Sequence, residues 1–346
     1  MIQEKSSKGR FFEDYLVGEV IYHSTPRTMT DGDRSLYISI YSSRFASYCS
    51  YEFAKKIGFE GFPFEDLAVF HMVFGKTVPD ISFNAIANLG YAEVKFFEPV
   101  FPGDTLKSES QVIGLKENSN GKSGVVYVET KGFNQNSKLV VKFKRWVMVR
   151  KRSDRLLGKE AVIPSIKTLL AAKEVPTNRK LKFDKFDYQA SGEKFKLDDY
   201  TIGEKIIHGG GVTLDESEHI LITRLWQNTS LVHFNINKRR DGRRIIYGGH
   251  IISMARAYSF NGLANAHTVH AINSGTHANP CFSGDTLYFW SEVLDKYHTD
   301  LPNYGLLRLR LIASKGEVET FEIKDNNNTY KSNIVLDLDY WVTIPS

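Results

Sequence analysis

The chain has 346 residues, a formal net charge of +5, 42% hydrophobic residues and 25% charged residues. These values are typical of a globular protein large enough for two domains of ordinary size. No run approaches the roughly 18 apolar residues of a membrane helix, and the N-terminal segment lacks the apolar core of a signal peptide. The two cysteines, Cys49 and Cys281, lack metal-type spacing, which argues against a disulfide scaffold. We therefore expect a cytoplasmic protein with no membrane partner.

An internal repeat organises the chain. FFEDYLVGEVIYH (11–23) returns as KLDDYTIGEKIIH (196–208), and EPVFPGDTLKSESQVIG (98–114) returns as NPCFSGDTLYFWSEVLD (279–295). Two matches in the same order indicate a tandem duplication. We expect an N-terminal half at 1–154, a connector with a short helix at 155–192, and a C-terminal half at 193–346.

Each half repeats one order of elements. Apolar helices are expected at 65–78 and 249–266, and each is followed by a Pro…Gly-Asp-Thr turn. Alternation of apolar and polar residues predicts strands at 123–133, 139–149, 306–314 and 333–344. The amide-rich segments 84–90 (NAIANLG) and 271–280 (AINSGTHANP) are expected to form turns after the helices. A helix followed by consecutive strands predicts an α+β domain, with the helix packed on an antiparallel sheet.

This order, with the paired turns PVFPGDTL (99–106) and PCFSGDTL (280–287), resembles the MaoC-like hydratases. The resemblance implies a double hotdog fold, in which each half wraps a curved antiparallel sheet around one long helix. The turn itself is a feature of the fold, because its glycine and aspartate shape the turn.

The catalytic signature of that family is Asp-x-Asn-Pro-hydrophobic-His, placed before the long helix. The second half has Asn228-Thr-Ser-Leu-Val-His233, with the histidine at the required spacing but asparagine at the Asp position. Serine and leucine stand at the Asn and Pro positions. The repeat places Ser43 and Tyr48 of the first half at the positions of Asn228 and His233. The resemblance therefore implies that the C-terminal half is catalytic and that the N-terminal half has lost the acid–base pair.

Longer segments resemble the mesaconyl-CoA hydratase family, also called β-methylmalyl-CoA dehydratase, over nearly the whole chain. These segments are 81–93, 119–130, 247–266 and 272–287. The resemblance implies reversible addition of water to the double bond of a branched, dicarboxylic enoyl-CoA such as mesaconyl-CoA. The substrate is then an acyl-CoA thioester, and no cofactor is expected because CoA is part of the substrate.

Hydration of an enoyl thioester requires a base that activates water, an acid that protonates the α-carbon, and donors for the enolate-like oxygen. His233 is the candidate for proton transfer, because an imidazole titrates near neutral pH. Asn228 cannot take a proton, but its amide can accept and donate hydrogen bonds. We expect Asn228 to hold the catalytic water or to fix the His233 tautomer, while the substrate's free carboxylate partly replaces the missing aspartate.

Gly248 and Gly249 stand where the second long helix begins. In the family, a backbone N–H at the equivalent glycine meets the thioester carbonyl, and a helix start directs N–H groups at negative charge. Close packing of the helix on the sheet is the structural alternative. Arg256, expected at the pocket mouth, and Arg44 are candidates for the substrate carboxylate, since arginine pairs a carboxylate through two hydrogen bonds; either can equally face solvent.

Basic residues cluster in two segments. The loop after His233 can hold the phosphates of CoA through Arg239, Arg240, Arg243 and Arg244. The other cluster, 142–152, alternates apolar and basic residues as a half-exposed strand does, and either forms a solvated face or attracts anions. We expect no nucleic-acid partner. We also expect no metal site, because the remaining histidines lack metal-ligand spacing, namely His250, His267, His270 and His277.

Other functions stay open on the residues alone. Another enoyl-CoA hydratase, a hotdog acyl-CoA thioesterase and a non-catalytic acyl-CoA binding protein are the alternatives. A thioesterase needs a carboxylate near the thioester carbon, and position 228 holds asparagine. Retention of His233 disfavours a purely binding role. A homodimer or a higher homo-oligomer is expected.

Overall fold

The computed structural model describes residues 5–158, 160–177 and 181–346. Its strands pair antiparallel in one sheet of 11 strands, in the order β1-β3-β4-β5-β2-β8-β11-β10-β9-β6, with β7 beside β9. The strands are β1 (Val20–Thr28), β2 (Ala85–Phe96), β3 (Thr105–Glu117), β4 (Ser123–Phe133), β5 (Leu139–Arg150), β6 (Lys205–Ile207), β7 (Val212–Thr213), β8 (Val269–His277), β9 (Thr286–His298), β10 (Tyr304–Lys315) and β11 (Ile334–Pro345).

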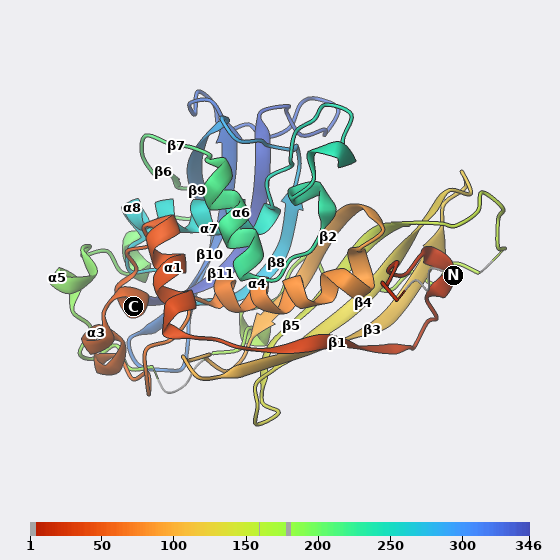
Figure 1. The fold of residues 1–346 in the computed structure, drawn as a ribbon. Coiled ribbons are helices and arrows are strands. Elements are labelled where there is room, and N and C mark those ends of the chain that lie inside the picture. Colours follow the sequence, from red (N-terminus) through yellow and green to blue (C-terminus); the bar gives the residue numbers. More distant parts are fainter. Residues whose placement is uncertain (1–4, 159, 178–180) are drawn as a thin grey trace.

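Helices lie against the concave side of the curved sheet, where α4 crosses the strands of the first half (Figure 1). The helices are α1 (Asp31–Tyr41), α2 (Ala46–Cys49), α3 (Tyr51–Lys56), α4 (Asp66–Thr77), α5 (Tyr188–Ser191), α6 (Glu216–Leu225), α7 (Gly248–Tyr258) and α8 (Phe260–Leu263). Shorter helical turns are Phe12–Asp14, Val78–Ser82, Ala172–Glu174, Leu197–Asp199, Leu231–His233 and Ile236–Lys238. The architecture is the expected α+β double hotdog.

The duplication is visible in matched hydrogen bonds. His23 bonds Ser110 through Nε2 at 2.8 Å, and His208 bonds Ser291 in the same way at 2.7 Å. The matching tyrosine hydroxyls, of Tyr15 and Tyr200, donate to backbone carbonyls of residues 81 and 262. In both Gly-Asp-Thr turns the aspartate accepts from the N–H three residues earlier. The repeat in the sequence therefore corresponds to a repeat in three dimensions.

The four predicted strands are confirmed as β4, β5, β10 and β11. The turns expected from the amide-rich segments are wrong, because most of both segments lies in β2 and β8, the strands that join the two halves. Glycines in these strands allow rings to lie directly on the backbone. A Cβ on Gly90 would lie 2.4 Å from the Trp146 ring, and one on Gly275 would lie 2.1 Å from the Tyr91 hydroxyl. Asparagine and glycine are typical of turns, so the composition of these segments did not indicate strands.

The second long helix is shorter than predicted. It ends at Tyr258, and the chain then bends at Asn261 (ψ 102°) and Gly262 (φ 92°) before β8. The connector carries a short helical turn, Ala172–Glu174, and α5. Its apolar residues, including Leu170 and Phe183, pack with residues of both halves.

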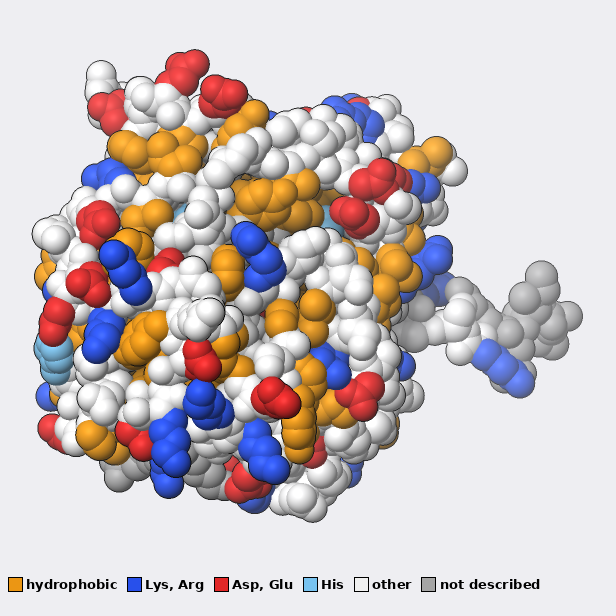
Figure 2. All heavy atoms as spheres, turned by 90° about the vertical axis from the view of Figure 1, so that its left-hand side faces the viewer, with side chains coloured by type: hydrophobic (Ala, Val, Ile, Leu, Met, Phe, Trp, Pro, Cys, Tyr) orange, Lys and Arg blue, Asp and Glu red, His pale blue; other side chains and the backbone are white. Residues whose placement is uncertain are grey.

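The surface of the described residues carries both signs of charge. Figure 2 shows basic and acidic side chains interspersed over one face. The basic segment 142–152 is largely ion-paired, through Lys142–Glu129, Lys144–Glu93, Lys151–Glu117 and Arg152–Asp14. No helix within the described ranges is long and apolar enough to cross a membrane.

Candidate active site

The candidate site lies between the end of α6 and the start of α7. Gln227 has a positive φ of 55°, which turns the chain sharply after α6. The Asn228 side chain then accepts a hydrogen bond from the Ser230 N–H at 3.0 Å, a local turn that asparagine favours. The short helix Leu231–His233 follows. This loop fixes the positions of Asn228 and His233 relative to α7.

His233 has a defined tautomer. Its Nδ1–H donates to the Ile245 carbonyl at 2.8 Å, so Nε2 carries the lone pair. Burial lowers the pKa of His233 to about 4, against the effect of the bond to Ile245. The residue as a whole is half-buried. At neutral pH His233 is therefore a neutral imidazole with a free basic nitrogen, as a general base requires.

Asn228 does not fix that tautomer, because the Ile245 carbonyl does. The Asn228 side chain is buried, accepts from the Ser230 N–H and lies close enough to the Tyr247 hydroxyl to lower its pKa, although burial raises that pKa overall. One of the two roles expected for Asn228 is thus corrected. Holding a catalytic water stays a prediction.

We expect Asn228→Ala to lower kcat/KM about 10-fold, because it removes the acceptor of a buried turn and leaves polar partners unsatisfied. Asn228→Asp keeps the acceptor for Ser230, and its negative charge should raise the pKa of His233, since a nearby opposite charge favours the imidazolium. Its kcat/KM–pH profile should therefore lose activity at a higher pH than the wild-type profile on the acid side. Full activity of the alanine variant would show that Asn228 has no role.

Gly248 and Gly249 begin α7, as expected. The first N–H groups of a helix have no acceptor within the helix, so these groups are available to a developing negative charge. A Cβ on Gly248 would lie 2.6–2.9 Å from the His277 ring, and a Cβ on Gly249 would lie 2.5 Å from the Tyr247 ring. Gly248 is half-buried, whereas Gly249 is buried beneath Tyr247. The close-packing alternative is therefore present at both glycines, and an anion can approach Gly248 more easily.

The two glycines should respond differently to alanine. Gly248→Ala should displace the exposed His277 ring and reduce kcat/KM about 100-fold with little change in stability, because small misplacements in a reacting site are costly. Gly249→Ala should destabilise the fold by about 1–3 kcal/mol, because the buried Tyr247 ring cannot move freely. Steady-state kinetics and thermal unfolding of both variants test this contrast. Equal effects on stability would contradict it.

Arg256 is not at an open pocket mouth. Its side chain is buried, lies 3.7 Å over the Phe45 ring, and donates to the carbonyls of Ala266 and His267 and to Ser259. Arg256 stands eight positions after Gly248, which corresponds to about 12 Å along a helix. The expected placement is wrong because its donors are used to hold the end of α7. Arg44 is exposed and stacks on Phe260, beyond the same end of the helix.

The four arginines after His233 do not behave alike. Arg239 pairs with Asp241, and Arg244 pairs with Glu216 and donates to the Phe234 carbonyl. Arg243 is exposed over the Phe282 ring at 3.8 Å, and Arg240 is exposed. Within the described residues neither Arg240 nor Arg243 forms an ion pair. These two are therefore the more available candidates for CoA phosphates.

Aromatic and imidazole side chains that the sequence did not indicate as site residues surround His233. The Tyr247 ring lies 5.6 Å from the His233 ring, and the His219 ring lies 5.9 Å from it. His219 Nε2 accepts from the Tyr247 N–H at 3.0 Å, which fixes the start of α7. His277, given little weight, lies against Gly248. Only Tyr247 could have been found from the sequence, because it stands directly before Gly248. His219 and His277 lie in other segments of the chain.

The first half has a different arrangement at the equivalent place. Tyr48, which replaces His233, donates to Asp66 at 2.9 Å, and Ser43, which replaces Asn228, donates to Glu65. Asp66 begins α4, so a carboxyl stands where the second half has the glycine pair. Burial raises the pKa of Asp66 to about 7. These residues satisfy one another and lack an imidazole, in agreement with an inactive first half.

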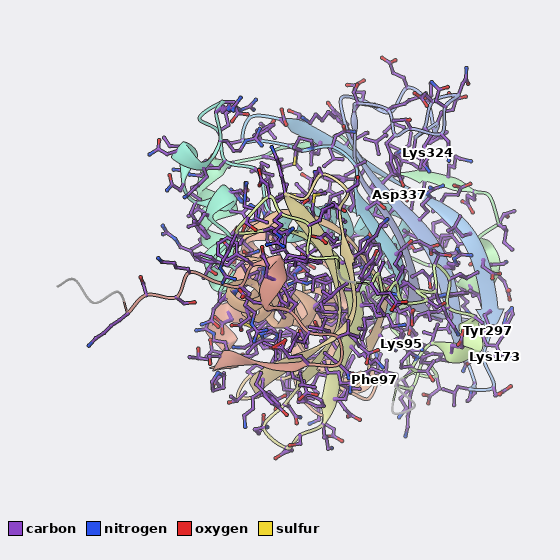
Figure 3. All side chains as sticks on the ribbon, turned by 90° about the vertical axis from the view of Figure 1, so that its right-hand side faces the viewer. Lys95, Phe97, Lys173, Tyr297, Lys324 and Asp337 are labelled. Atoms are coloured by element: carbon purple, nitrogen blue, oxygen red, sulfur yellow. The ribbon has the colours of Figure 1, made fainter. Side chains whose placement is uncertain are left out.

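A large cavity of about 630 Å³ lies elsewhere, between β2, β5 and the connector. Figure 3 labels Lys95, Phe97 and Lys173 from its lining. Its charged side chains largely neutralise one another, for example in the pair Lys144–Glu93. It contains none of the site residues considered above. We therefore place the candidate active site at His233 and not at this cavity.

The fold defines a MaoC-like double hotdog protein, in which His233 is the candidate hydratase histidine. The family model described as mesaconyl-CoA hydratase matches residues 2–317, and the chain belongs to this family. It is 53% identical to the mesaconyl-CoA hydratase of Cereibacter sphaeroides (99% of each chain covered) and 49% identical to the β-methylmalyl-CoA dehydratase of Chloroflexus aurantiacus (99% and 98%).

Solved structures agree. A MaoC domain protein dehydratase from Chloroflexus aurantiacus is 48% identical and superposes with a TM-score of 0.96, covering 99% of each chain. A double hotdog protein of Mycobacterium tuberculosis, at 22% identity, superposes with a TM-score of 0.79, covering 96% of this chain and 98% of the other. The second likeness supports the fold alone.

Proposed function

We propose that this protein is a hydro-lyase that reversibly adds water to the double bond of mesaconyl-CoA to give β-methylmalyl-CoA. The observation that carries the proposal is the chain-long identity of 53% to a mesaconyl-CoA hydratase. The geometry supports it, because a neutral imidazole with a free Nε2 lies beside the N-terminal end of a helix.

In the proposed reaction, His233 Nε2 accepts a proton from water while the water oxygen attacks the β-carbon. Electrons of the double bond move to the thioester oxygen, which the N–H groups at the start of α7 stabilise. The imidazolium formed at His233 then returns its proton to the α-carbon. Burial lowers the pKa of His233 to about 4, so this imidazolium is a strong acid. One histidine can therefore supply both proton transfers. The scheme does not require the substrate's free carboxylate to replace the missing aspartate, but it is compatible with that contribution.

We further propose that Arg240 and Arg243 bind the CoA phosphates, with Arg239 and Arg244 as weaker contributors because they are already ion-paired. Cytoplasmic location and assembly as a homo-oligomer are proposals as well. Both cysteines are free, which suits a reducing compartment.

One assay separates the candidate functions. The protein is incubated with mesaconyl-CoA while the absorbance of the conjugated enoyl thioester and the release of free thiol are followed together. A hydratase lowers the absorbance without releasing thiol. Thiol release would identify a thioesterase, and no change in either signal would indicate a binding protein.

A further inference from the structure

Arg145 of β5 is a buried cation without a hydrogen-bonding partner. Its side chain is fully buried, and none of its three guanidinium nitrogens has a partner among the described residues. The guanidinium lies over the Phe74 ring, 4.3 Å from the centroid. Burial lowers the pKa of Arg145 to about 10, so the group stays charged at neutral pH. A buried charge that lacks a partner is strongly unfavourable, and its presence therefore points to a missing anion.

Arg145 belongs to the surroundings of the candidate active site. Arg145 and the Tyr247 hydroxyl are close enough to affect each other's pKa electrostatically. The Tyr247 ring lies 5.6 Å from the His233 ring. Helix α4 contacts both Arg145 and Tyr247. Its Phe74 ring stacks on Arg145, and its His71 ring lies 5.9 Å from the Tyr247 ring. The first half thus contributes a cation near Tyr247, whose ring packs beside the candidate catalytic histidine of the second half.

A second orphan donor lies beside Arg145. The pairing of β5 with β2 places Arg145 directly opposite Tyr91, so both side chains lie on the same face of the sheet. The Tyr91 hydroxyl is also buried without a partner among the described residues. The Tyr91 ring lies 6.0 Å from the ring of His277, which contacts Gly248. Arg145 and Tyr91 are therefore connected, through the His277 ring, to Gly248 at the start of α7.

The duplication provides an internal comparison. Trp146 and Trp341 match in the two halves, so Tyr340 occupies the position of Arg145. Helices α4 and α7 align through the residues before them: the Phe64 N–H donates to the Val100 carbonyl, and the Ile246 N–H donates to the Cys281 carbonyl. In this alignment Arg256 of α7 occupies the position of Phe74 of α4. Both halves therefore place an arginine and an aromatic residue at this point. Arg256 donates to three groups of the chain, whereas Arg145 donates to none described. Of these two arginines, Arg145 is the one without a hydrogen-bonding partner among the described residues.

We propose that Arg145 binds the free carboxylate of a dicarboxylic acyl-CoA, with the Tyr91 hydroxyl as a second donor. This inference rests on the proposed hydratase function and assigns its specificity. A guanidinium matches a carboxylate with two parallel hydrogen bonds. The bound carboxylate satisfies the buried charge, while an acyl group that ends in a methyl leaves it unsatisfied. Arg145 therefore selects dicarboxylic over monocarboxylic substrates.

The test compares two unreactive ligands, methylsuccinyl-CoA and 2-methylbutyryl-CoA, which differ in the free carboxylate. Arg145→Met should weaken binding of methylsuccinyl-CoA about 100-fold, because it removes the partner of a buried charge, and should change binding of 2-methylbutyryl-CoA less than about threefold. Arg150→Met removes an exposed arginine from the same strand and should leave both affinities unchanged. Equal loss for both ligands, or no loss for either, overturns the proposal.

A stability readout separates this role from a structural one. Without ligand, Arg145→Met should melt at the same temperature as the wild type or higher, because it removes an unpartnered charge. Arg256→Met should melt at a lower temperature, because it leaves three acceptors without their donor. A lower melting temperature for Arg145→Met, similar to that of Arg256→Met, overturns the proposal. Binding is measured without turnover, so a wild type that prefers methylsuccinyl-CoA but fails to hydrate mesaconyl-CoA refutes the hydratase function and not the role of Arg145.

Discussion

His233→Asn is expected to lower kcat for hydration of mesaconyl-CoA about 1,000-fold, within the usual range for loss of a general base. The asparagine amide can still donate to the Ile245 carbonyl in place of Nδ1–H, so the loop should keep its conformation. It has no basic nitrogen at the position of Nε2, and the proton from water then has no acceptor. The variant isolates proton transfer from folding and binding.

Circular dichroism, the melting temperature and the affinity for methylsuccinyl-CoA should all stay near the wild-type values in His233→Asn. A variant that retains more than about a tenth of the wild-type kcat would show that another group is the base. Loss of kcat together with loss of fold would leave the alanine and glutamine variants to distinguish the two causes.

The second large effect concerns acid stability. Desolvation in the folded state lowers the pKa of eight histidines to between about 3 and about 4: His71, His208, His219, His233, His250, His267, His270 and His277. Unfolding restores an ordinary value near 6.5, so the unfolded chain binds more protons between pH 6.5 and pH 4. The stability that depends on these neutral imidazoles is complete above pH 6.5 and is lost as the pH falls.

Four carboxyls oppose this effect. Burial raises the pKa of Glu65, Asp66, Glu193 and Glu218, so the folded state holds protons there that the unfolded state releases. The histidines outnumber these carboxyls, so unfolding between pH 6.5 and pH 5 should take up protons net. Each net proton corresponds to about 1.4 kcal/mol of stability lost per pH unit, and ordinary domains are stable by only about 5–15 kcal/mol. We therefore expect the free energy of unfolding to fall steeply below pH 6.5.

Urea unfolding at a series of pH values between 7 and 5 measures this slope. His270→Gln, which removes one buried imidazole that bonds Tyr304, should reduce the slope by about one proton. A free energy of unfolding that stays constant between pH 6.5 and pH 5 would show that the buried histidines do not control acid stability.

The sequence allowed the duplication and the fold to be predicted, and it indicated a candidate catalytic histidine, because these depend on local spacing. The repeated Gly-Asp-Thr turns and alternating strands are short-range patterns, and His233 stands at a fixed distance from Asn228 and the α7 glycines. The second helix was predicted too long because the bend at Asn261 and Gly262 interrupts an otherwise apolar run.

The surroundings of His233 could not be predicted in the same way. Arg145 belongs to a basic segment whose other cations are largely ion-paired, and the inward register of β5 buries it. Arg256 looked available because its acceptors, the carbonyls of Ala266 and His267, lie on a chain segment whose path depends on the bend after α7. The Ile245 carbonyl determines the tautomer of His233, and no side-chain pattern reveals a backbone acceptor.

The most direct test of the central claim is hydration of mesaconyl-CoA in ¹⁸O-labelled water, with the wild type and His233→Asn at equal concentration. The wild type should form β-methylmalyl-CoA with one ¹⁸O atom, an intact thioester and no free CoA, while His233→Asn should form about 1,000-fold less per unit time. Absence of labelled product with the wild type, or equal rates for the two proteins, would contradict a histidine-dependent hydratase.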